Sequence, residues 1–189
     1  MNLRHGRLSA GLIGAFALID PTLPALANDP PSASPWTIER STIALTGAAS
    51  VIASLTSTEP LHNQIGQPER AILVLRCTEG AMAAYVAWPQ VLPIDTTNFG
   101  GRPQTMVLFR IDDAPIRYDF WIRSDDGTGV GGFDTHRATH IASQIITAHR
   151  FVIRLTGSET QDAVFELADI SRVASEVGAA CGVRWTAAR

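Results

Sequence analysis

A glycine-rich segment has the spacing of a phosphate-binding or calcium-binding loop. Residues 125–134 have the sequence DDGTGVGGFD, in which Gly127, Gly129 and Gly132 complete a G-x-G-x-x-G pattern. In a dinucleotide-binding fingerprint these glycines open a helix within a parallel βαβ unit, and an acidic residue follows about 20 positions later. Here the flanking sequence predicts antiparallel strands, and Phe133 and polar residues follow the glycines. We therefore expect no nucleotide site.

The same segment carries acidic side chains that could hold a cation. They are Asp125, Asp126 and Asp134. An EF-hand loop needs acidic residues at alternate positions and a terminal glutamate, and adjacent aspartates do not match that spacing. We expect a mobile turn with solvated acids.

Two histidines lie four residues apart on a predicted helix. His136 and His140 could place two imidazoles on one metal ion, but the sequence has no H-E-x-x-H motif and indicates no third ligand. A G-x-S-x-G nucleophile elbow is also missing from the sequence. We expect surface histidines, with no catalytic residue, metal or cofactor. The alternative is a cell-wall hydrolase that uses these histidines and nearby aspartates.

The N-terminus has the three parts of a secretory signal peptide. Arg4 and Arg7 form a positive region, residues 8–19 are apolar, and Ala25 and Ala27 form an A-x-A cleavage motif. The apolar stretch of about a dozen residues is short for a membrane anchor, which needs roughly 20. We predict cleavage after Ala27, a signal peptide over 1–27 and a periplasmic protein.

Charge and composition describe the rest of the chain. The formal net charge is −3, and removing residues 1–27 would change it to −4, because two arginines and one aspartate are lost. Such a surface argues against nucleic-acid binding, which needs a basic stripe. We predict a disordered leader over 28–35, one globular domain over 36–185 and no membrane span. The oligomeric state is left open.

The two cysteines, Cys77 and Cys181, predict a disulfide, because an even number of cysteines in a protein of an oxidising compartment is typical of disulfide bonding.

Apolar and alternating segments predict about seven antiparallel strands, at 49–57, 70–77, 81–88, 105–112, 116–124, 150–157 and 162–169. Helices are predicted at 135–148 and 169–181. The fold class is α+β: an antiparallel β-sheet or incomplete sandwich with two short helices on one side. A pure β-sandwich is the alternative.

The segment 116–124 alternates between two faces. Ile116, Tyr118, Phe120 and Ile122 share the face that we assign to the core, and Arg117, Asp119, Trp121 and Arg123 share the other. Outward arginines of neighbouring strands, at positions 110, 150 and 154, would extend that second face. Cross-strand charge pairs explain much of it. A tryptophan among arginines is also typical of an interface hot spot. The candidate partner-binding residues are therefore Arg117, Trp121, Arg123, Asp125 and Asp126.

Several fragments in a fixed order resemble one family. They are LVLRC, YVAW, VLFRID, FWIRSDD, FELADI and the closing AAC. This order resembles the periplasmic type VI secretion-associated proteins of the VasI (TagO) family, over residues 36–185. The resemblance implies an exported accessory protein of a contractile secretion machine and supplies no catalytic residues.

The sequence thus favours a non-enzymatic periplasmic accessory or binding protein, whose partner is another protein of the cell envelope. An inhibitor or immunity-type protein is a further alternative beside the hydrolase.

Overall fold

The computed structural model describes residues 34–98, 100–155 and 161–185. The predicted signal peptide and nearly all of the predicted leader lie outside these residues. The strands are β1 (Thr37–Thr42), β2 (Ala49–Thr56), β3 (Leu61–His62), β4 (Pro68–Glu69), β5 (Ile72–Thr78), β6 (Ala81–Ala87), β7 (Thr96–Thr97), β8 (Pro103–Ile111), β9 (Arg117–Arg123), β10 (Gly129–Gly132), β11 (Arg150–Leu155) and β12 (Asp162–Glu166). The helices are α1 (Thr135–Ile145) and α2 (Ile170–Ala180).

Ten of the described strands form one antiparallel sheet. Its order is β1-β2-β5-β6-β10-β9-β8-β11-β12, and β7 pairs with β8 at the side; β3 and β4 form a separate pair. The antiparallel sheet and two helices are confirmed, but the predicted number of about seven strands is wrong. The missed strands give little apolar signal: β1 has the polar sequence TIERST, β7 has two residues, and β10 consists mostly of glycine.

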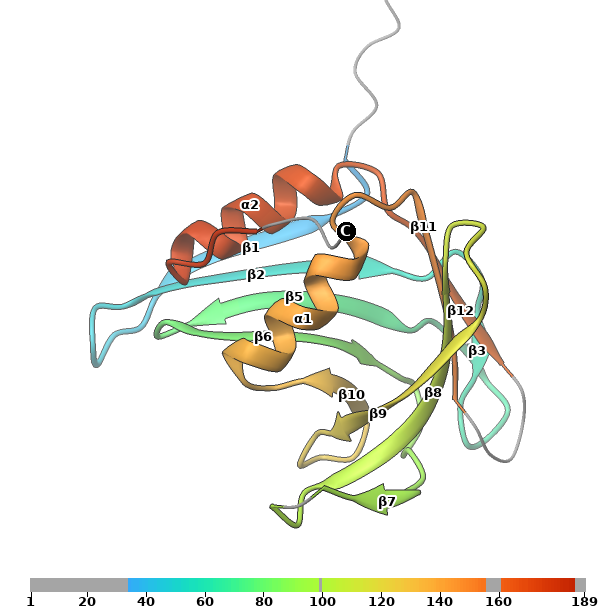
Figure 1. Ribbon diagram of the computed structural model, residues 1–189. Helices are drawn as coiled ribbons and strands as arrows, with labels where there is room; N and C mark the ends of the chain where they lie inside the picture. The colour runs from blue at the N-terminus through green and yellow to red at the C-terminus, as the bar shows by residue number, and fades with distance from the viewer. Residues whose placement is uncertain (1–33, 99, 156–160, 186–189) are drawn as a thin grey trace, which may run out of the picture. The chain divides into compact units, whose positions relative to one another are not determined.

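The sheet curves strongly, and both helices lie on one of its faces (Figure 1). Figure 1 shows α2 along β1 and β2, and α1 across β5 and β6, while β8, β9, β11 and β12 turn up on the same side. We call this helix-bearing side the inner face and the opposite side the outer face. Each helix turns a stripe of buried residues to the sheet, such as Ala138, Ile141, Ala142 and Ile145 of α1.

The hydrophobic core fills the inner face. Leu73 and Leu75 of β5 and Val107 of β8 belong to one cluster of buried residues with the helices. Aromatic rings extend the cluster through the second half of the sheet. Phe151 stacks on Phe165 with ring centroids 6.1 Å apart and on Trp121 with centroids 6.4 Å apart.

The predicted disulfide is confirmed. Cys77, on β5, is fully buried and bonds to Cys181, which caps the C-terminal end of α2. The two Cα atoms are 5.6 Å apart, across a sequence separation of 104 residues. The bond therefore ties the last turn of α2 to a central strand.

The glycine-rich segment is a strand, so the predicted mobile turn is wrong for Gly129–Gly132. β10 pairs with four residues of β6 but with only two of β9, and so joins the two halves of the sheet. Where the pairing of β10 with β9 has ended, Arg137 of α1 contacts β9 instead, by donating a hydrogen bond to the carbonyl of Phe120 (2.9 Å). The glycines are needed because neighbouring backbone approaches closely: a Cβ at Gly131 would lie 2.5 Å from the Cα of Tyr85.

We expect Gly132→Ala to lower the free energy of unfolding by about 1–3 kcal/mol, the usual cost of overpacking. A Cβ at Gly132 would lie 2.5 Å from the backbone nitrogen of Ala138, so α1 would have to shift. Chemical denaturation measures the effect. Gly100→Ala is the matched control, because its Cβ would meet only the Asn98 side chain at 3.4 Å. Equal stability of the two variants would contradict the close packing of β10 against α1.

Candidate functional site

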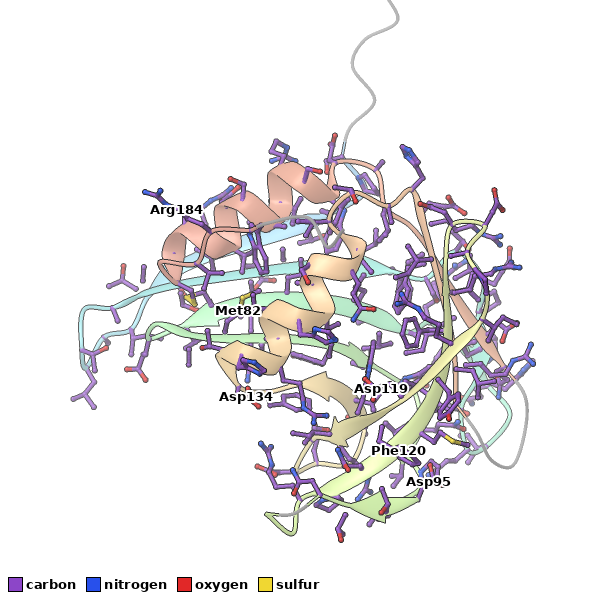
Figure 2. The ribbon with its side chains drawn as sticks, viewed as in Figure 1. Met82, Asp95, Asp119, Phe120, Asp134 and Arg184 are labelled. Carbon is purple, nitrogen blue, oxygen red and sulfur yellow. A yellow bond between two sulfur atoms is a disulfide. The ribbon has the colours of Figure 1, made fainter. Side chains whose placement is uncertain are left out.

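The tryptophan predicted to face outward is in the core. Trp121 is only 2% exposed, because its indole packs against Phe109 and Phe151 in the core of the inner face. Its indole N–H donates a hydrogen bond to Asp119 Oδ2 (3.2 Å), so the buried polar group has a partner. Figure 2 shows Asp119 on the side of β9 toward α1 and Phe120 on the opposite side. The predicted orientation of β9 is therefore wrong.

The other predicted partner-binding residues lie along β9 and the turn that follows it, and the charge of Arg123 contributes to lowering the pKa of Asp126. Arg117 is exposed at the start of β9, where its guanidinium lies 5.0 Å from the centre of the Phe109 ring. Arg123 is half-buried at the end of the strand, and Asp125 and Asp126 lie beyond it. Arg117 begins β9 and Asp125 lies two residues past its end, so one partner would have to cover the length of the strand to contact both.

The outer face of the same region exposes apolar side chains. Tyr118 is 73% exposed and Ile116 is 66% exposed. Tyr118 lies opposite Leu108 of β8, and Val152 of β11 is opposite Arg110, so these side chains share the outer face. We define the outer patch as Leu108, Ile116, Tyr118, Phe120 and Val152. The alternation of residues 116–122 was visible in the sequence, but it does not say which face is buried.

A small cavity of about 280 Å³ lies at the outer patch. Leu108, Ile116 and Val152 form its apolar walls, and Arg110 and Arg154 contribute charges. Arg154 binds Asp162 with two hydrogen bonds, one of them 2.8 Å from Nη2 to Oδ2. Among the described residues, no ion pair engages Arg110. The patch therefore offers apolar surface beside one available guanidinium.

The ion pair at this cavity makes stability depend on pH. The hydrogen-bonded Arg154 guanidinium lowers the pKa of Asp162, with a smaller contribution from the charge of Arg110. A carboxyl whose pKa is lower in the folded state stabilises the fold above its unfolded pKa, and this stabilisation is lost as pH falls through the folded pKa.

We therefore expect Asp162→Asn to be less stable than the wild type at pH 7, by up to about 1 kcal/mol for a half-exposed pair. The difference should shrink as pH falls below the ordinary range of an aspartate. Urea unfolding of both proteins from pH 7 to pH 2 measures it. A difference that stays constant across this range would contradict the assigned ion pair.

A second feature, the polar hollow, lies on the outer face near β10. It has a volume of about 580 Å³ and is lined by Arg76, Tyr85, Ala87, Arg102, Ser124, Asp125, Asp126, Thr128, Gly129 and Phe133. The ring of Tyr85 is 5.2 Å from that of Phe133, and the Arg76 guanidinium lies 5.6 Å from the Tyr85 ring centre. The hollow thus combines an aromatic wall with charges of both signs.

Hydrogen bonds order the turn that borders the hollow. Asp126 Oδ1 accepts bonds from the Ser124 hydroxyl and the Thr128 backbone N–H (3.0 Å), and the Gly129 N–H donates to Ser124 Oγ (2.7 Å). The bond from Ser124, followed by that from Thr128, lowers the pKa of Asp126. The turn therefore holds an ionised carboxylate at the rim of the hollow.

The next feature is the pair of histidines that could bind a metal ion. His136 and His140 are exposed on α1. Within residues 34–98, 100–155 and 161–185, no three His, Cys, Asp or Glu side chains are grouped as a metal site would require. No helix in this part of the chain has the length and hydropathy to cross a membrane.

Comparisons with protein-family models, with curated proteins and with solved structures find no significant match to this chain.

Proposed function

We propose that this protein is an exported, non-enzymatic binding protein of the bacterial periplasm and an accessory to a type VI secretion system. The signal-peptide pattern of residues 1–27 supports export, and the Cys77–Cys181 disulfide is typical of an oxidising compartment. The order of the fragments that resemble the VasI (TagO) family supports the link to secretion.

We assign the contact with a protein partner to the outer patch. The observation that carries this assignment is the exposure of two adjacent large side chains, Tyr118 and Ile116, at 73% and 66%. Large amphipathic aromatics are enriched at interfaces because one ring gives much contact area at a small entropy cost.

The patch also defines the chemistry of its partner. Apolar side chains of the partner would cover Tyr118 and fill the cavity beside Ile116 and Leu108. A carboxylate of the partner would face Arg110, because Arg154 is already paired with Asp162. The partner is therefore a protein segment with an apolar centre and at least one acidic side chain.

Site-specific photo-crosslinking tests this assignment in the producing bacterium. A benzoylphenylalanine at position 118 should capture one envelope protein, identified by mass spectrometry of the adduct. The control places the same crosslinker at Leu45, which is 94% exposed in the turn after β1, on another part of the surface. Equal capture from both positions, or capture only of a second copy of this chain, would refute the assignment.

A further inference from the structure

We propose a second binding site, in the polar hollow, for a short peptide with a free ammonium group and a free carboxylate. The hollow lies beside β10 and past the C-terminal end of β9, whereas Ile116 and Tyr118 of the outer patch lie at its start. The proposal therefore stands independently of the proposed function.

The charges of the hollow carry this inference. Arg76 and Arg102 line the same cavity as Asp125 and Asp126. Within the described part of the chain, no ion pair joins either arginine to either aspartate. Opposite charges that face one space without pairing can each bind a ligand group of the other sign. A carboxylate fits the guanidinium groups, which can bind it with two parallel hydrogen bonds.

The shape and walls of the hollow favour a peptide. A volume of about 580 Å³ lies within the usual range for small-ligand sites, about 300–1,000 Å³. Tyr85 and Phe133 give an apolar wall on which a middle side chain could pack. Arg76 is already held over Tyr85, which reduces the freedom that this guanidinium would lose on binding.

The hollow is less suited to other small ligands. A phosphate or nucleotide would meet repulsion from Asp125 and Asp126 at the rim. A neutral sugar could hydrogen-bond to these groups but would bring no charge to meet Arg76, Arg102 and Asp125. Because Asp126 is fixed by Ser124 and Thr128, the acidic rim is in place before any ligand binds.

Calorimetric titration of the purified protein tests the proposal with the tripeptide Ala-Leu-Ala. We expect saturable binding, and about tenfold weaker binding when either terminus is blocked by acetylation or amidation. Arg102→Gln should remove the sensitivity to C-terminal amidation, and Asp125→Asn the sensitivity to N-terminal acetylation. Tyr118→Ala in the outer patch and Arg110→Gln in the cavity beside it lie away from the polar hollow, and both variants should bind the peptide as the wild type does.

Three results would overturn the proposal. They are no binding of Ala-Leu-Ala, equal binding of the doubly blocked peptide, and tighter binding of N-acetylglucosamine or inorganic phosphate. Loss of peptide binding in Tyr118→Ala would also overturn the independence of the two sites.

Discussion

Replacing Trp121 with alanine is expected to lower the free energy of unfolding by about 3–5 kcal/mol, the usual cost of truncating a large buried aromatic. Its indole is 2% exposed and packs on Phe109 and Phe151, with ring centroids 5.8 Å and 6.4 Å away. The substitution also removes the N–H that bonds to Asp119. Equilibrium denaturation monitored by circular dichroism measures the loss.

The matched control is Tyr118→Ala, three residues earlier on the same strand. Tyr118 is 73% exposed, so its removal should change stability by less than about 0.5 kcal/mol. Comparing the two variants separates an effect on stability from an effect on partner binding, because Trp121→Ala could lose a partner through unfolding alone. Equal stability losses in the two variants would contradict the orientation of β9.

Replacing both Cys77 and Cys181 with serine should lower the free energy of unfolding by about 2–5 kcal/mol. In the chain-entropy model a crosslink that closes a loop of about 100 residues contributes up to about 4.7 kcal/mol, by restricting the unfolded chain. The observed separation is 104 residues. Thermal and urea unfolding of the double variant and the wild type measure the difference.

Reductant provides the internal control for this prediction. Wild-type protein unfolded in the presence of dithiothreitol should approach the stability of the serine variant, whereas the variant should not respond. We also expect the last turn of α2 to exchange its amide hydrogens faster in the variant, because Cys181 caps that helix. An unchanged unfolding midpoint after loss of the bond would contradict the stabilising role.

The sequence predicted the elements with strong periodic signals. The strands near Cys77, the hairpin turn at Glu79–Gly80, both helices and the disulfide are present in the structure. The face of β9 could not be predicted, because a period of two does not identify the buried side. Ile116, Tyr118 and Phe120 look more suited to the core than Arg117 and Asp119. In the structure the face of Arg117 and Asp119 is nevertheless the inner one, because Trp121 on that face packs among the core aromatics.

The residues of the candidate sites could likewise be predicted only in part, because local sequence does not show which distant residues meet. The sequence predicts Asp125 and Asp126 as candidate contact residues, and both line the polar hollow. Arg76 and Arg102 come from distant parts of the chain, and only the order of the sheet brings them to the same cavity. The glycines of β10 suggested a loop, because no local signal shows the close approach of β6 and α1.

The most direct test of the proposed function is the affinity of the envelope protein captured at position 118, measured with purified components. We expect Tyr118→Ala and Ile116→Ser each to weaken this affinity by at least about tenfold, as is usual for interface hot spots. Leu45→Ser, on a distant turn, should change it by less than about twofold. Unchanged affinity in both outer-patch variants, with their folds intact, would contradict the assignment of partner binding to this surface.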